Sequence, residues 1–262
     1  DLKTAYLQAI AGGRSAYVRI RGCLRDALPP DLLEASKGMK NPVFKLERAL
    51  YGRVRSGKDW GIKIEKHLRE MGFRAVASCR GLFYHAGKQM LLAIYVDDLI
   101  LACDEHQASE FFKELEKKVE LKVSQGKKFE ETRRFLGIEY DVERIRDFRV
   151  ASVSMKGYCQ RLIQLYEEEF SIKIRPRRTL DEEPTQPGPK SEIGNRYRPV
   201  TGALLWLVRC YRPDLAKAVS IIGQNITTWS DAHTNFLHSL LGVISSTSDH
   251  VMKMYFHVDD KP

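Results

Sequence analysis

Apolar positions change their spacing along the chain, and this change predicts which segments form strands and which form helices. Over 58–71, Trp60, Ile64 and Leu68 recur at helical spacing, and Gly72 ends the pattern. Short apolar runs bounded by turn residues predict strands. The expected strands are 16–20, 81–86, 89–96, 135–142, 148–154 and 251–258, and the expected helices are 58–71, one that follows Asp104, 156–170, 196–210, 213–228 and 231–247.

Two polar stretches separate these elements. Residues 31–41 follow two prolines and are expected to form a loop, and 173–194, rich in Pro, Arg and Glu, are expected to form a mobile connector. Strands and helices mix before the connector, whereas helices dominate after it. The pattern therefore predicts an α+β domain followed by a helical subdomain.

The run LLAIYVDDLILAC (91–103) places two adjacent acids, Asp97 and Asp98, inside an otherwise apolar stretch. A strand–turn–strand hairpin accommodates them, with the acids at the tip, where side chains reach solvent or a cleft. Two interpretations are open. The acids form an ordinary Asp-rich turn, or they bind a divalent cation such as Mg²⁺, which prefers carboxylate oxygens. The second interpretation requires a third carboxylate from elsewhere, so that two metals can support in-line phosphoryl transfer.

The composition of the chain predicts a polyanionic partner. The formal net charge is +9 and the pI about 9.3, and Lys and Arg gain affinity by releasing counterions from phosphates. The five cysteines are scattered, with no CxxC, which argues against a zinc site or a disulfide framework and favours an intracellular protein. No apolar run reaches the length of a membrane span, so no membrane partner is expected. The sequence starts at Asp1 within what reads as a structured segment, and we expect a piece of a longer protein.

Five motifs in order resemble one family, the copia-type LTR retrotransposon reverse transcriptases. The tetrapeptide YVDD resembles the catalytic box of these polymerases, and the other blocks resemble their first motif, their template and nucleotide-pocket motif, the primer grip and the thumb. The blocks are DLKTAYLQA (1–9), VFKLERALYGRVRSGKDW (43–60), YVDD (95–98), FLGIEY (135–140) and YRPVTGALLWLVRCYRPDLAKAVS (197–220). This resemblance favours the metal-site interpretation of the two acids.

The resemblance implies a palm, an antiparallel sheet with helices on one face, followed by a helical thumb. It places the palm, with a remnant of the fingers, at 1–154 and the thumb and connection helices at 155–250. Residues 251–262 resemble the start of a truncated RNase H-like region, in which Asp259 would be the first acid.

The resemblance also implies the catalytic groups. Asp1, Asp97 and Asp98 would bind two Mg²⁺ ions, with Mn²⁺ as an alternative, and the Leu2 carbonyl would lend a further oxygen. Lys127 or Lys128 would be the general acid that protonates pyrophosphate, although a solvated charge pair is the other interpretation.

Substrate contacts follow from the same comparison. Tyr6 would be a steric gate against a 2′-hydroxyl or, alternatively, a core aromatic. Tyr51 and Gly52 would line the nucleotide pocket, where Gly permits close backbone approach. Trp60 is expected in the core. The expected primer and template contacts are Tyr95, Phe135, Leu136, Gly137, Arg53 and Arg55, with hairpin packing as the alternative for Tyr95 and a solvated face for the two arginines.

The implied activity is RNA-directed DNA synthesis on a primed RNA or DNA template from deoxynucleoside triphosphates. RNase H and integrase domains of the same polyprotein would be its neighbours, in a cytoplasmic particle or the nucleus. Arg53 to Gly57 depart from the family's usual Leu-Lys-Gln-Ala-Pro, and the basic fingers are expected before Asp1. A catalytically inactive remnant that binds nucleic acid through charge is therefore an alternative, and an unrelated Mg²⁺ nucleotidyltransferase is a third hypothesis.

Overall fold

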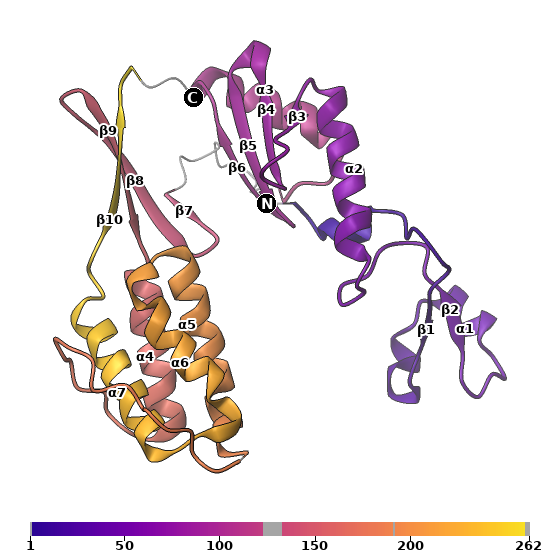
Figure 1. Ribbon diagram of the computed structural model, residues 1–262. Helices are drawn as coiled ribbons and strands as arrows, with labels where there is room; N and C mark the ends of the chain where they lie inside the picture. Colours follow the sequence, from indigo (N-terminus) through magenta and orange to yellow (C-terminus); the bar gives the residue numbers. More distant parts are fainter. Residues whose placement is uncertain (1, 123–132, 191, 260–262) are drawn as a thin grey trace. The chain divides into compact units, whose positions relative to one another are not determined.

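The computed structural model describes residues 2–122, 133–190 and 192–259. The chain divides into two compact units, residues 1–131 and 132–262, and each is described by itself (Figure 1). Both units combine helices with antiparallel sheet, which confirms the mixed α and β class expected from the sequence. Within the described ranges, no helix has the length and apolar character needed to cross a membrane.

A four-stranded antiparallel sheet organises the first unit. Its strand order is β3-β4-β5-β6, and the two helices α2 and α3 share one core with it. Trp60, Ile64 and Leu68 of α2 and Phe111 and Leu115 of α3 are buried in that core, as their helical spacing predicts. The bounds are Arg74–Ala75 for β3, Leu82–His85 for β4, Met90–Tyr95 for β5, Asp98–Ala102 for β6, Ser56–Glu70 for α2 and Glu105–Glu116 for α3.

A smaller lobe, residues 12–48, leaves the first unit and returns to it. It contains a two-stranded antiparallel ladder of β1 (Tyr17–Arg19) and β2 (Val43–Lys45) together with the short helix α1 (Pro30–Ala35). At its root, the Ala11 amide donates to the Glu47 carbonyl at 3.0 Å and the Ala49 amide donates to the Ala9 carbonyl at 2.9 Å. The expected loop over 31–41 is wrong in its first part, because Pro30 at the first helical turn is favourable for helix initiation.

The second unit joins another four-stranded antiparallel sheet, in the order β10-β9-β8-β7, to the helices α4, α5, α6 and α7. The sequence grouped 135–154 with the first unit and 251–258 with a following region. In the structure β10 pairs with β9 along its whole length, from Met252 opposite Val153 to His257 opposite Phe148. The bounds are Arg134–Phe135 for β7, Ile138–Ile145 for β8, Phe148–Ser154 for β9, Met252–His257 for β10, Lys156–Phe170 for α4, Arg198–Cys210 for α5, Ala216–Gln224 for α6 and Asp231–Ser246 for α7.

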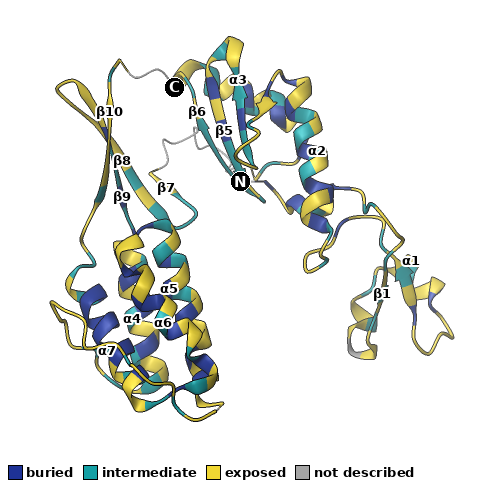
Figure 2. Cartoon of the chain, viewed as in Figure 1, coloured by how far each residue is buried: buried dark blue, intermediate teal, exposed yellow. Residues whose placement is uncertain are grey.

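The core of the second unit lies among its helices (Figure 2). Leu204, Ile222 and Leu240, from α5, α6 and α7, are fully buried there. The rings of Tyr197 and Trp229, both members of this core, stack with centroids 4.2 Å apart. The expected helix over 213–228 is interrupted, since short 3₁₀ turns at Pro213–Leu215 and Ile226–Thr228 flank α6.

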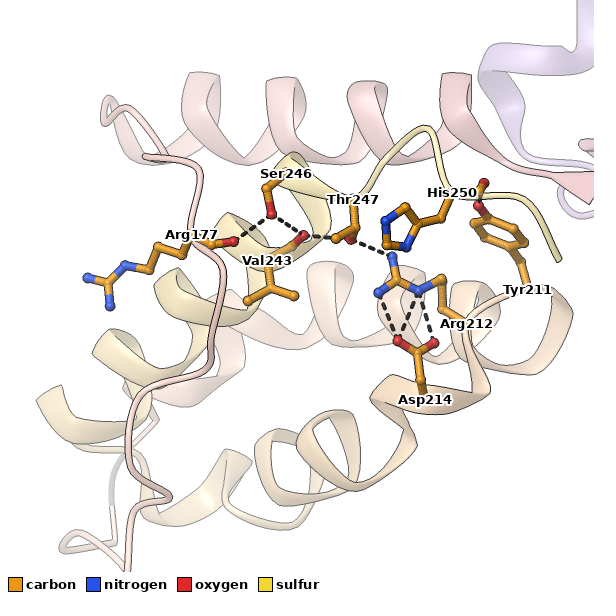
Figure 3. A network of polar contacts seen from close by, with 8 residues as sticks. All are labelled: Arg177, Tyr211, Arg212, Asp214, Val243, Ser246, Thr247 and His250. Atoms are coloured by element: carbon orange, nitrogen blue, oxygen red, sulfur yellow. Dashed lines mark hydrogen bonds and ion pairs between the residues drawn. The ribbon is translucent and has the colours of Figure 1, made fainter.

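A buried arginine ties the helices of the second unit together (Figure 3). Arg212 is 5% exposed and donates to the Asp214 carboxylate and, at 2.8 Å, to the Thr247 hydroxyl at the end of α7. The neighbouring Ser246 hydroxyl donates to the Arg177 carbonyl at 2.5 Å and so attaches the connector to α7. The network satisfies a charge that would otherwise be costly to bury.

Asp214 gives this network a pH dependence that can be measured. The hydrogen bonds from Arg212 hold the pKa of Asp214 below its ordinary value of 3.8. A depressed pKa stabilises the fold above that value and the contribution disappears as the pH falls through the folded-state pKa. Because the Asp214 side chain is 57% exposed, solvent screening limits the effect, and Asp214→Asn is expected to reduce the unfolding free energy by about 1 kcal/mol or less near neutral pH, and by less at about pH 3.

Urea unfolding at the two pH values checks this expectation. Glu182→Gln, which removes an exposed carboxylate from the connector, is the matched control and should change little at either pH. An Asp214→Asn effect that stays constant down to about pH 3 would contradict the assigned pKa direction.

Candidate active site

The turn between β5 and β6 holds the two adjacent acids. Tyr95 pairs with Asp98, so the turn residues are Val96 and Asp97, and Asp98 already belongs to β6. Val96 has a φ of +57°, the left-handed conformation that a tight hairpin turn requires. Asp97 and Asp98 are both partly buried. The sequence predicted this hairpin with both acids at its tip, whereas in the structure only Asp97 is a turn residue and Asp98 is the first residue of β6.

Two hydrogen bonds to backbone carbonyls, one from a side chain and one from a backbone amide, hold this turn in place. The Trp60 indole N–H of α2 donates to the Val96 carbonyl at 2.8 Å, and the Leu2 amide donates to the Asp97 carbonyl at 2.7 Å. Both anchors are rigidly placed, since Leu2 is fully buried and Trp60 is 3% exposed. Leu2 also forms an isolated antiparallel bridge with Leu121. Trp60 is a core residue, as expected, and its indole also fixes the acidic turn.

The charges of Asp97 and Asp98 are not balanced by other side chains in the part of the chain that the structure describes. No ion pair there involves either carboxylate, although both are partly removed from water. Two adjacent oxygen ligands on a fixed turn suit a hard divalent cation, which usually takes one or two protein carboxylates and completes its shell with water and phosphate. The same ranges contain no cluster of three acidic, His or Cys side chains with metal-binding geometry. Asp1, the expected third ligand, and Lys127 and Lys128, the candidate general acids, lie outside the described residues.

Tyr6 and Tyr51, both predicted at the nucleotide pocket, lie together in the structure. Their ring centroids are 4.6 Å apart, with the planes inclined by 34°. Tyr51 is 47% exposed, whereas Tyr6 is partly buried beside the core of the first unit. Gly52 follows with a φ of +85°, a conformation that Gly adopts without strain. The pair presents an aromatic surface next to a sharp backbone turn.

A buried carboxylate organises the arginines that the sequence assigned to the template. The Asp59 side chain is 3% exposed and accepts from Arg55 Nε at 2.9 Å and from the Gly12 amide at 3.0 Å. Arg53 Nη1 lies 3.6 Å from the same carboxylate, and Arg53 Nη2 donates to the Gly12 carbonyl at 2.9 Å. The two guanidinium groups therefore hold the root of the 12–48 lobe, and Asp59 is a site residue that the sequence reasoning missed.

The remaining predicted contacts are divided between the two units. Tyr95 in the first unit is 56% exposed beside the acidic turn. Phe135, Leu136 and Gly137 belong to the second unit, where Leu136 and Gly137 form the tight turn between β7 and β8 with φ of +53° and +81°.

Comparison with known proteins places most of the chain among retrotransposon sequences. The family described as "Reverse transcriptase (RNA-dependent DNA polymerase)" matches residues 27–172. The chain is 26% identical over 246 residues to the "Retrovirus-related Pol polyprotein from transposon RE1" of Arabidopsis thaliana and 25% identical over 238 residues to that from transposon RE2 of the same plant. It is 22% identical over 243 residues to the polyprotein from transposon TNT 1-94 of Nicotiana tabacum.

These alignments cover most of this chain and a small part of each relative. They include 88%, 88% and 85% of the chain but only 16%, 16% and 18% of the three polyproteins. The chain therefore spans less than a fifth of the length of these relatives. No solved structure matches the chain.

Proposed function

Because the chain belongs to the reverse transcriptase family, in its copia-type retrotransposon branch, we propose that it carries an RNA-directed DNA polymerase site at the turn between β5 and β6. The single observation that supports this proposal best is the turn itself. Asp97 and Asp98 are adjacent on a backbone fixed by Trp60 and Leu2, and no ion pair among the described residues neutralises them. An ordinary Asp-rich turn needs neither of those anchors.

The proposed chemistry is nucleotidyl transfer to a primer 3′-hydroxyl. Bound Mg²⁺, or Mn²⁺ in its place, would supply Lewis-acid activation of the hydroxyl and stabilise charge on the leaving pyrophosphate. Asp97 and Asp98 would be protein ligands, with Asp1 as the third carboxylate and the Leu2 carbonyl as a further oxygen. The fixed turn would keep these oxygens in place, which suits a reaction that depends mainly on positioning.

The substrate contacts proposed for the first unit are the neighbouring rings of Tyr6 and Tyr51 and the residues near the turn. Tyr6 would exclude a 2′-hydroxyl, and Tyr51 and Gly52 would face the incoming deoxynucleoside triphosphate. Tyr95, exposed beside the acids, would lie along the primer end. Arg53 and Arg55 would act on the template indirectly, since Asp59 already engages both.

The second unit would supply the primer grip and the thumb. In the Phe135–Gly137 turn, two successive residues have left-handed backbone conformations, so the chain turns sharply. This tight turn supports a role in contacting the primer backbone. Helices α4 to α7 would form the thumb, within the proposed limits of 155–250, and residues 1–154 would form the palm and part of the fingers. Lys127 or Lys128 would protonate pyrophosphate. RNase H and integrase segments of the same polyprotein would be partners.

Primer extension is the experiment that tests this proposal. The chain, alone and joined to its flanking polyprotein sequence, is given a primed RNA template, the four deoxynucleotides and Mg²⁺. We expect incorporation that requires both template and Mg²⁺. Incorporation without a template would favour an unrelated nucleotidyltransferase. Retained primer–template binding with no incorporation in either form would favour the inactive remnant.

A salt titration of binding accompanies this assay. Because the chain carries a net charge of +9, primer–template affinity is expected to fall at least about tenfold between about 50 and 200 mM salt, as counterion release from two or more phosphates requires. Fluorescence anisotropy of a labelled primer–template measures the affinity. An affinity that does not change over this range would show that the basic charge does not contact phosphate.

A further inference from the structure

Strands β8, β9 and β10 form a ribbon whose two faces differ in charge. Residues directly opposite one another in an antiparallel ladder share a face, and neighbours along a strand alternate between faces. Arg149 of β9 lies opposite Arg144 of β8 on one side and Phe256 of β10 on the other. The row two residues along consists of Val142, Ala151 and Met254. These six residues are named the arginine face.

The carboxylates of β8 belong to the opposite face. Asp141 pairs with Ser152, and Glu143 pairs with Val150, so both acids point away from the arginine face. They also have cations of their own, since Arg133 Nη1 lies 3.4 Å from Asp141 and Lys253 Nζ lies 3.9 Å from Glu143. The two rows of the arginine face contain no acid, so its positive charge is not offset within the face, whereas the cation Lys253 on the opposite face lies beside Glu143.

The two arginines of this face have no carboxylate partner among the described residues. Arg144 Nε makes a long contact of 3.4 Å to the Arg146 carbonyl, and Arg149 has no ion pair there. Like charges directly opposite one another across two strands are unfavourable, because their side chains start only about 4.5–5.5 Å apart. An anion placed between the two guanidinium groups would remove this repulsion and accept hydrogen bonds from both.

The apolar members of the arginine face are unusually open to solvent. Phe256 is 49% exposed and Val142 is 60% exposed, and Figure 2 shows most of β10 and the turn end of the ribbon in yellow. An exposed aromatic ring beside two cations is the combination with which proteins hold single-stranded nucleic acid. The cations contact phosphates, and the ring stacks on a base regardless of sequence.

We propose that the arginine face is a second nucleic-acid contact, which binds a single-stranded segment of template or product. Arg144 and Arg149 contact consecutive phosphates and Phe256 stacks on a base. This contact goes beyond the proposed polymerase site, because it uses no residue of the acidic turn and needs no metal. A folded protein partner would be expected to place a carboxylate between the arginines, whereas a phosphate strand also explains the exposed ring.

The test compares single-stranded and duplex oligonucleotides bound by the whole chain, with EDTA present and salt varied. The double variant R144Q/R149Q is expected to bind a labelled single strand at least about tenfold more weakly at low salt, and the slope of log affinity against log salt should fall by about 1.4. Phe256→Ala is expected to weaken single-strand binding about fivefold or more, with a smaller effect on duplex binding.

The matched control is R175Q/R178Q, which removes the same charge from two exposed connector arginines. Equal losses in the two double variants would overturn the proposal, because they would show that only net charge matters. Unchanged single-strand affinity in R144Q/R149Q would also overturn it. If that variant instead changes the self-association of the chain, measured by ultracentrifugation, the arginine face would be assigned to protein contact. Binding measured in EDTA does not depend on metal binding by Asp97. A failure of the polymerase proposal would therefore not change the interpretation of this test.

Discussion

Replacing Asp97 by Asn is expected to reduce Mg²⁺-dependent primer extension at least about a hundredfold, while primer–template affinity changes less than about twofold. The carboxylate supplies metal-binding charge, whereas affinity comes mainly from phosphate contacts elsewhere. Asn has nearly the same shape as Asp, and the hydrogen bond from Leu2 to the Asp97 carbonyl uses the backbone, so the turn itself should persist. The expected loss is therefore chemical.

Single-turnover extension and anisotropy on the same preparations separate these effects. Asp104→Asn, which removes an exposed carboxylate just after β6, is the control and should extend primers normally. Replacing Mg²⁺ by Mn²⁺ is expected to recover part of the Asp97→Asn activity, since Mn²⁺ also takes oxygen ligands and has less strict geometric demands than Mg²⁺. Extension by Asp97→Asn at near the wild-type rate would remove this residue from the metal site.

Long periodic segments were predictable from the sequence, because their apolar face is set by local spacing. The expected helix over 156–170 coincides with α4, and the hairpin strands around the acidic turn were found. Register was harder. Strand alternation alone does not decide which residues form a turn. The sequence placed both acids at the tip, whereas the turn consists of Val96, with a φ of +57°, and Asp97. The expected helix over 213–228 is helical in the structure, but only Ala216–Gln224 is α-helix, with short 3₁₀ turns at Pro213–Leu215 and Ile226–Thr228 on either side.

Functional residues that depend on distant contacts could not be predicted in this way. Trp60 reads as one more apolar position of α2, and only the folded chain shows its indole on the Val96 carbonyl. Asp59 is separated from Gly12 by 47 positions, so nothing local indicates their hydrogen bond. One signal was available in the sequence. Asp59 directly precedes the core residue Trp60, so it does not lie on the exposed face of its helix, and it stands four residues after Arg55, the spacing of a helical ion pair.

Asp59→Ala is expected to have the largest effect on the stability of the first unit, about 3 kcal/mol or more. The substitution leaves the Gly12 amide without its acceptor and two guanidinium groups without their counter-charge. The substitution would destabilise the environment of Arg53 most, because its Nη1 atom already lacks a hydrogen-bond partner and its side chain is only 18% exposed. Removing one member of a buried ion pair costs more than the pair contributes, because the remaining charge stays desolvated.

The loss should appear first at the root of the 12–48 lobe, because Asp59 holds the point where that lobe leaves the first unit. Hydrogen exchange in Asp59→Ala is expected to accelerate over residues 12–48 before the β4–β5–β6 amides respond, and Asp59→Asn, which keeps an acceptor for Gly12, should lose about half as much stability. Asp26→Ala, an exposed acid in the same lobe, controls for loss of charge. If the lobe carries part of the nucleotide pocket, the apparent KM for deoxynucleotides should rise more than kcat falls in Asp59→Asn. Exchange that accelerates evenly over the whole unit would mean that Asp59 stabilises the core in general and does not position the lobe.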